Sequence, residues 1–253
     1  MDEMIFPEVF YELFREMPRQ GPGSNIFTRK AYELLPDVPR KPEILDIGCG
    51  SGMQTLELAR ISGGKLTALD NYQPFLDTLD RQAKLAGLDK QVETVNGSMF
   101  ELPFDKSSFD VIWSEGAIFI IGFEKGLWEW QQLLRPGGYL VVSELCWLQP
   151  DRPEAVRSYM AQVYPAMKDI AGSMAAIRDA GYRDLGNFIL PEAVWLDDFY
   201  QPMQSKINIL KTKYAGDAEA LELLRGMQTE IDMYQKYRRY YGYIYYIMQV
   251  SDK

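Results

Sequence analysis

The most informative absence in this sequence is histidine, since none of the 253 residues is one. Histidine is the usual general base near neutral pH and the commonest metal ligand in proteins. We therefore expect no metal site. Any proton transfer must use an aspartate, glutamate, tyrosine, lysine or cysteine, or the substrate itself.

Cysteine and long apolar runs are also scarce. The two cysteines, Cys49 and Cys146, form neither a disulfide framework nor a zinc-ligand spacing, so we expect reduced thiols. The start of the chain, 1–4, is acidic, and no apolar run approaches the roughly 20 residues of a membrane span. These features predict a cytoplasmic protein with no membrane partner.

Basic residues are outnumbered, with 27 Lys and Arg against 36 Asp and Glu and a formal net charge of -9. A surface this acidic repels phosphate backbones, so we expect no nucleic-acid partner. Nothing in the composition marks a domain boundary, which favours one domain over 1–253. The sequence does not determine the oligomeric state, and a homodimer is among the states that it allows.

Strand-like and helix-like segments alternate along the chain. The predicted strands are 43–47, 65–70, 92–95, 109–114, 139–146, 182–190 and 243–250, and the predicted helices are 25–35, 53–61, 74–86, 125–134, 154–167, 174–179 and 218–234. β-Branched and aromatic strands joined by helices indicate a mostly parallel sheet covered on both faces. We therefore predict an α/β fold with seven strands and helical elaborations at about 151–180 and 193–217.

The segment Asp46-Ile47-Gly48-Cys49-Gly50-Ser51-Gly52 joins the first predicted strand to a helix. Such a turn brings bare backbone N–H groups and the positive end of a helix dipole against a ligand, as nucleotide-like cofactors require. The alternative is a tight turn without a ligand, although three glycines are costly to order for that purpose alone. A dinucleotide fingerprint needs a third glycine where Met53 stands, which disfavours a nicotinamide-dependent oxidoreductase.

Asp70 closes the second predicted strand. An acidic residue at the carboxyl end of a strand in an α/β sheet can accept both hydroxyls of a ribose. The alternative is a cap for the following helix. Beside the glycine turn, the ribose role is favoured.

Five motifs follow one another between about 35 and 150: the glycine turn, Leu69-Asp70-Asn71, the run 96–104, the run 109–116 and the run 133–140. Together and in this order they resemble the motifs of class I S-adenosylmethionine-dependent methyltransferases. Gly21-Pro22-Gly23-Ser24 and Ser114-Glu115-Gly116-Ala117 are similar to segments of a bacterial and archaeal small-molecule-type subgroup.

The resemblance implies a Rossmann-like three-layer sandwich whose last strand is antiparallel. It also implies an N-terminal helical lid at 1–40, a cofactor-binding core at 41–150, and a substrate-side elaboration with the final strands at 151–253. The alternative to a lid at 21–24 is a simple loop before the helix at 25–35. The implied contacts to S-adenosylmethionine are Gly23, Asp46, Gly48, Cys49, Gly50, Gly52, Asp70, Asn71, Gly97, Ser98, Met99, Ser114 and Glu115. Many family members have an acidic residue where Ser98 stands, so the polar contact to adenine is weaker here.

The expected reaction is methyl transfer to a small molecule, giving S-adenosylhomocysteine, and it depends mainly on alignment and exclusion of water. Glu115 is the candidate catalytic residue, able to contact the cofactor, orient a substrate amine or act as a base. The alternative is a carboxylate at a helix start. Candidate substrate-side residues are Trp147, Trp195, Asp198 and Tyr200, although most aromatics of this region are expected in the core.

A protein that binds S-adenosylmethionine without catalysis remains the alternative function. The sequence identifies neither the acceptor nor the atom that is methylated.

Overall fold

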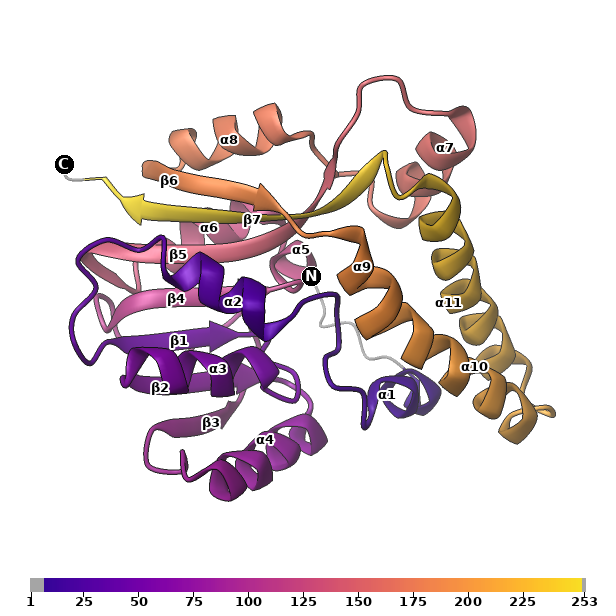
Figure 1. Ribbon diagram of the computed structural model, residues 1–253, viewed down its shortest axis with the longest axis horizontal. Helices are drawn as coiled ribbons and strands as arrows, with labels where there is room; N and C mark the ends of the chain where they lie inside the picture. The colour runs from indigo at the N-terminus through magenta and orange to yellow at the C-terminus, as the bar shows by residue number, and fades with distance from the viewer. Residues whose placement is uncertain (1–6, 252–253) are drawn as a thin grey trace.

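The computed structural model describes residues 7–251, which form one seven-stranded sheet flanked by helices (Figure 1). The acidic segment 1–4 and the first six residues of the expected lid lie outside the described residues. The strands, in the spatial order β3-β2-β1-β4-β5-β7-β6, are β1 (Glu43–Ile47), β2 (Lys65–Asp70), β3 (Val92–Asn96), β4 (Phe109–Glu115), β5 (Leu134–Trp147), β6 (Tyr182–Ile189) and β7 (Tyr241–Val250). Strands β1 to β5 are parallel, and β7 is antiparallel to both of its neighbours, which confirms the predicted sheet.

The helices follow the predicted alternation closely. They are α1 (Glu8–Phe14), α2 (Asn25–Tyr32), α3 (Met53–Ser62), α4 (Gln73–Ala86), α5 (Ile118–Ile121), α6 (Phe123–Gln131), α7 (Glu154–Val163), α8 (Ile170–Asp179), α9 (Glu192–Trp195), α10 (Gln201–Lys213) and α11 (Ala218–Tyr237), with a π-helical turn η1 (Leu196–Tyr200) between α9 and α10. The predicted helix at 154–167 ends early, because Tyr164 precedes Pro165 and the residue before a proline disfavours helical backbone.

Successive strand residues point to opposite faces of the sheet, which separates the apolar core into two layers. Ile44 and Val111 pack in one layer with α1 to α4, α10 and α11. Leu45 and Ile112 pack in the other with α5, α6 and α8. This is the expected three-layer sandwich.

The carboxyl ends of the central strands meet at one edge of the sheet. Ile47 lies opposite Leu69, and Asp70 lies opposite Asn96. Asp46 lies opposite Trp113, so Glu115 at the end of β4 reaches the same edge. Parallel α/β sheets bind ligands beyond this edge, and most of the predicted cofactor residues converge there.

The expected lid region contains α1, which packs against α10 and α11 (Figure 1). Glu12 fastens it there, since its carboxylate accepts hydrogen bonds from Lys213 Nζ at 2.6 Å and from the Tyr214 hydroxyl at 2.8 Å. The helical elaboration after β6 therefore holds the N-terminal helix in place.

Over residues 7–251, we find no helix with both the length and the apolar character that crossing a membrane requires.

Candidate functional site

The glycine turn between β1 and α3 depends on the absence of side chains. Gly48, Gly50 and Gly52 have φ angles of +72°, +55° and +80°, in the left-handed region that favours glycine. A Cβ atom on Gly48 would lie 2.5 Å from the Ala117 Cβ, and one on Gly52 would lie 2.3 Å from the Leu79 Cδ1. The turn therefore needs glycine for its conformation and for its close neighbours.

The N–H groups of this turn are all bound by the protein. Those of Gly48 and Cys49 donate to the Leu69 carbonyl at 2.8 and 3.0 Å, and that of Gly52 donates to the Cys49 carbonyl at 3.0 Å. The Gly50 N–H donates to Asp70 Oδ2, and the Ser51 N–H donates to Gln20 Oε1. The expectation of bare N–H donors is wrong for these five groups, so the turn offers a ligand its shape rather than its hydrogen bonds.

Asp70 joins the glycine turn to the loop after β2. Its Oδ2 accepts the Gly50 N–H at 2.9 Å, and its Oδ1 accepts the Tyr72 N–H at 3.0 Å. Burial raises its pKa, and the backbone donors oppose that rise. A carboxylate has about four lone-pair sites, so both oxygens retain acceptor capacity for a ligand's hydroxyl groups. Neighbouring Asn71 is exposed.

Asp46 lies beneath the turn and is fully buried. Its Oδ2 accepts a hydrogen bond from the Thr55 hydroxyl at 2.6 Å, while its Oδ1 has no partner. Burial raises the pKa of this carboxyl to about 7, and the nearby Glu115 adds to the rise, while Thr55, Arg19 and Gln54 oppose it.

The pKa of Asp46 predicts how stability changes with pH. Because its folded pKa exceeds its ordinary value of 3.8, protonated Asp46 stabilises the fold fully below pH 3.8, and this contribution is lost as the pH rises through about 7. We expect the wild type to lose on the order of 2 kcal/mol relative to Asp46→Asn between about pH 5 and about pH 8. Urea unfolding of both proteins at the two pH values measures this difference. If the free energy of unfolding changes equally in the wild type and in Asp46→Asn, Asp46 does not titrate in this range.

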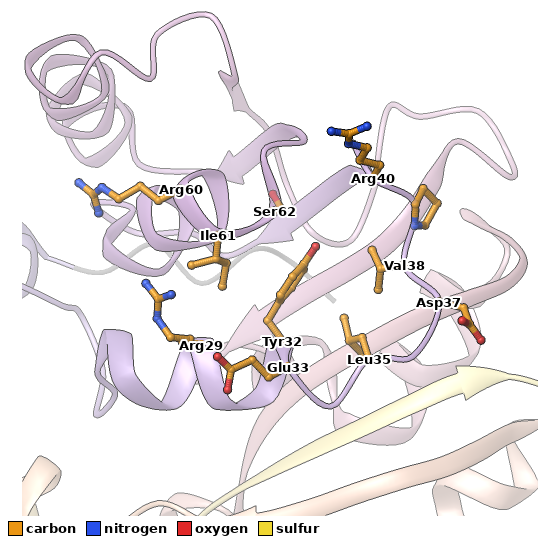
Figure 2. Close-up of a pocket in the computed structure, with 11 residues that line it drawn as sticks. Arg29, Tyr32, Glu33, Leu35, Asp37, Val38, Arg40, Arg60, Ile61 and Ser62 are labelled. Atoms are coloured by element: carbon orange, nitrogen blue, oxygen red, sulfur yellow. The ribbon is translucent and has the colours of Figure 1, made fainter.

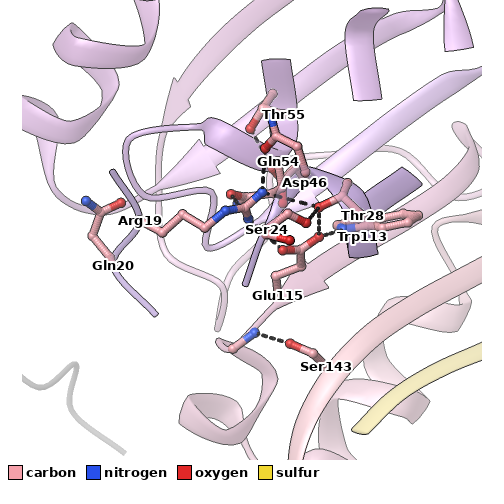
Figure 3. A network of polar contacts seen from close by, with 12 residues as sticks. Arg19, Gln20, Ser24, Thr28, Asp46, Gln54, Thr55, Trp113, Glu115 and Ser143 are labelled. Carbon is pink, nitrogen blue, oxygen red and sulfur yellow. Dashed lines mark hydrogen bonds and ion pairs between the residues drawn. The ribbon is translucent and has the colours of Figure 1, made fainter. Parts of the chain in front are cut away.

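A second network fastens residues 15–24, which we call the strap, to the end of β4 (Figure 3). Arg19 Nη1 lies 2.7 Å from Glu115 Oε2, and both side chains are buried, with 10% and 5% exposed. The Thr28 hydroxyl and Trp113 Nε1 donate to Glu115 Oε1 at 2.7 and 2.9 Å. Both Glu115 oxygens are thus occupied, an arrangement suited to holding the strap. Its catalytic role stays a prediction.

The strap also closes over the glycine turn. Gln20 Oε1 accepts hydrogen bonds from the Ser51 N–H at 2.7 Å and from the Ser51 hydroxyl at 3.0 Å. Gly23 approaches the ion pair so closely that a Cβ there would lie 3.2 Å from Glu115 Oε2. Just before the strap, the Tyr11 ring stacks on Tyr72 with centroids 3.9 Å apart. The strap and α1 therefore cover the edge that holds the turn and Asp70.

The remaining predicted cofactor residues lie around this edge. The Gly97 N–H donates to the Asp70 carbonyl at 3.1 Å, and Met99 Cε lies 3.5 Å from the position of a Cβ on Gly48. The Ser98 hydroxyl accepts a hydrogen bond from the Phe100 N–H at 3.2 Å. The buried Ser114 hydroxyl donates to the Ile47 carbonyl at 2.9 Å and so ties β4 to β1.

The predicted substrate-side residues do not converge in the same way. Trp195 and Tyr200 are buried in an aromatic cluster, where Trp195 stacks on Tyr234 with centroids 4.4 Å apart. Trp147 lies under the Arg152 guanidinium at 4.6 Å, and Asp198 is exposed on η1. Their contact with a substrate stays a prediction.

Sequence reasoning missed Arg19, Gln20, Thr28 and Trp113. Arg19 and Gln20 directly precede the Gly21-Pro22-Gly23 segment, which is part of the predicted lid. A basic residue next to that segment was the available signal. Its partner Glu115 is 96 positions away in the sequence, so the pairing itself left no local pattern.

Away from this edge, a hollow of about 690 Å³ opens on the surface (Figure 2). It lies between the end of α2, the loop before β1 and the end of α3, and its lining includes Arg29, Tyr32, Arg40 and Arg60. No predicted site residue lines it, so the edge at the glycine turn is the candidate functional site. Among residues 7–251, no cluster of three or more Cys, Asp or Glu side chains has an arrangement that could hold a metal ion.

Comparison with known proteins matches this site to one kind of domain. A family model described as "Methyltransferase domain" matches residues 45–142, from β1 to β5. A sterol 24-C-methyltransferase of Gibberella zeae is 28% identical over 180 residues, which cover 67% of this chain and 47% of that protein. A demethylmenaquinone methyltransferase of Clavibacter sepedonicus is 35% identical over 137 residues, covering 53% and 54%. The chain thus spans about half the length of these curated relatives.

Solved structures agree on the fold over nearly the whole chain. A SAM-dependent methyltransferase from Geobacter sulfurreducens, solved in complex with S-adenosyl-L-homocysteine, has a TM-score of 0.83 at 21% identity. The alignment covers 97% of this chain and 99% of that one. The α1 and α10–α11 additions therefore belong to an architecture that other proteins share.

Proposed function

We propose that this chain, whose residues 45–142 form a methyltransferase domain, transfers a methyl group from S-adenosylmethionine to a small-molecule acceptor and releases S-adenosylhomocysteine. The domain match and the fold confirm the resemblance drawn from the motifs. The curated relatives named above methylate small molecules according to their names, which supports a small-molecule acceptor here.

The observation that carries this proposal is the junction of the glycine turn with Asp70. The 2.9 Å bond from the Gly50 N–H to Asp70 Oδ2 fixes an acceptor carboxylate beside a turn that excludes even one methyl group at three positions. A bulky adenosyl ligand needs such a close backbone surface, and its ribose needs such an acceptor. The glycine turn and Asp70 therefore fit S-adenosylmethionine as the methyl donor.

Each part of the edge has a definite role in this proposal. When bound, S-adenosylmethionine supplies a methyl group that its sulfonium centre already activates. Asp70 holds the ribose hydroxyls, and Met99 offers apolar surface beside Gly48. The strap, held by the Arg19–Glu115 ion pair, covers the donor and excludes water, so that alignment accounts for most of the acceleration.

Turnover is tested with labelled S-adenosylmethionine and an extract of cell metabolites, followed by mass spectrometry of the labelled product. A labelled small molecule is the expected result. Binding of S-adenosylhomocysteine without any labelled product would instead favour a non-catalytic binding protein. Thermal stabilisation by NAD alone would overturn the methyltransferase proposal.

Asp70→Ala is expected to weaken S-adenosylhomocysteine binding by about 1–3 kcal/mol, because hydrogen bonds to a charged group are lost. Isothermal titration calorimetry measures the affinity. The matched control is Asp77→Ala, since Asp77 is an exposed carboxylate on α4 that bonds only locally, to Gln73 at 2.8 Å. Equal affinities for the two variants would remove Asp70 from the ribose site.

We propose that residues 1–40 form a lid, residues 41–150 the cofactor core and residues 151–253 the substrate side. We further propose that the protein is cytoplasmic, a compartment in which its two free cysteines would stay reduced. We also propose that it binds no nucleic acid, which the net charge of -9 supports.

A further inference from the structure

Glu144 is a buried carboxylate that the network at Glu115 does not include. The residue is only 3% exposed, and neither of its carboxyl oxygens has a hydrogen-bond partner. No ion pair found among residues 7–251 involves it. An unpaired buried carboxyl is costly, and native structures rarely keep one without a functional reason.

The strand register places Glu144 at the functional edge. Glu115 lies opposite Ser143, so Glu144 is the first residue of β5 beyond the end of β4. The Ser143 hydroxyl accepts the Gly116 N–H at 2.8 Å, which holds the turn after β4 against β5. The next residue, Ala117, abuts Gly48 of the glycine turn. Glu144 therefore neighbours the turn that separates the cofactor edge from the face covered by α5.

Aromatic side chains lie near this carboxyl and the turn after β4. The Tyr164 hydroxyl lies near the Glu144 carboxyl, but the two groups do not meet the geometry of a standard hydrogen bond. The Tyr164 ring meets Phe119 of α5 edge to face, with centroids 6.0 Å apart. On the other side of the turn, the Tyr243 hydroxyl lies 3.2 Å from the position of a Cβ on Gly116.

Among residues 7–251, the titratable groups that face Glu144 carry no positive charge. They come from the end of α7, from β5 and from β7, and they are Tyr164, Cys146, Tyr243 and Tyr246. Burial raises the pKa of Glu144 to about 8, opposed by Tyr164 and by the Leu145 N–H. A positive ligand at this carboxyl would meet no competing cation.

We propose that Glu144 binds an acceptor that carries a primary or secondary amine, and that it takes the proton from the ammonium nitrogen. This inference rests on the methyl transfer proposed above. The N–H bond breaks and its proton moves to the Glu144 carboxylate, leaving the nitrogen lone pair free. That lone pair forms the new N–C bond as the C–S bond of the donor breaks, and the electron pair of the C–S bond remains on sulfur.

An ammonium group fits this place better than a neutral hydroxyl group. It supplies the missing counter-charge for the carboxylate, and the rings of Tyr164 and Phe119 favour a nearby cation. The net charge of -9 also raises the local concentration of cations around the protein.

The test uses benzylamine as the probe and benzyl alcohol as its neutral counterpart. Isothermal titration calorimetry first measures S-adenosylhomocysteine affinity, and then probe affinity with S-adenosylhomocysteine saturating, at about pH 7 in two buffers of different ionisation enthalpy. The wild type is expected to bind benzylamine at least about tenfold more tightly than benzyl alcohol, since only the amine gains a charged hydrogen bond. Binding should release a proton, because the paired carboxyl ionises.

Glu144→Gln is expected to lose both the preference for benzylamine and the proton release, while its S-adenosylhomocysteine affinity is unchanged. Cys146→Ser is the control, a buried side chain two positions along the same face of β5, and it should behave as the wild type. Equal binding of both probes to the wild type, no benzylamine binding, or proton release that persists in Glu144→Gln would each overturn the assignment. Failure of the wild type to bind S-adenosylhomocysteine would instead contradict the proposed function.

Discussion

Gly48→Ala is expected to weaken S-adenosylhomocysteine binding on the order of 100-fold, because a displaced turn misplaces several contacts at once. The new Cβ would lie 2.5 Å from the Ala117 Cβ, and the backbone would keep a φ of +72°. Left-handed strain and overlap each cost about 1–3 kcal/mol, so the turn or the segment after β4 must move. Calorimetric titration with S-adenosylhomocysteine measures the loss.

Gly63→Ala separates the effect on the site from the strain itself. Gly63, at the other end of α3, has a φ of +61°, and a Cβ there would meet nothing within 4 Å. The Gly63→Ala variant should lose about 1 kcal/mol of stability and keep the wild-type affinity for S-adenosylhomocysteine. If both alanine variants bind S-adenosylhomocysteine as the wild type does, the glycine turn is not the cofactor site.

Arg19→Met is expected to lower the free energy of unfolding by about 3–5 kcal/mol, because it leaves Glu115 charged, buried and unpaired. Glu115 is only 5% exposed, so water cannot replace the lost guanidinium. The same variant should weaken S-adenosylhomocysteine binding, since the strap loses its attachment to β4. Urea unfolding measures the first effect and calorimetry the second.

Two further variants test whether the effect comes from the pair. Arg19→Met combined with Glu115→Gln should cost less than the sum of the single changes, because no uncompensated charge remains. Arg225→Met breaks the exposed Arg225–Glu222 pair on α11 and should cost no more than about 1 kcal/mol. A loss in Arg19→Met as small as that in Arg225→Met would show that the strap is held by other contacts.

The edge at which we propose that the cofactor binds was predictable, because its sequence signals are local. Gly48, Gly50 and Gly52 are close neighbours in the sequence, and their positive φ angles follow from the turn that they form. Asp70 ends the next strand, and parallel strands bring their carboxyl ends to one edge. Periodicity similarly predicted all seven strands and the two-sided burial of the sheet.

The contacts of individual side chains were not predictable in this way. Asp198 lies exposed on a π-helical turn that no periodicity indicated, and its contact with a substrate stays a prediction. Glu144 sits in a strand whose sequence predicts only that the strand is buried, and its lack of a partner emerges only when α5, α7 and β7 pack around it.

By itself, the sequence determined the fold class, the glycine turn and the place of Asp70, because strand alternation and the geometry of parallel sheets act over short stretches of chain. Only the tertiary structure decided that Arg19 neutralises Glu115, that Gln20 closes the turn, and that Glu144 is left without a partner. Each of these depends on residues tens of positions apart. Their partners are set by how the helices pack on the sheet, and such packing leaves no period in the sequence.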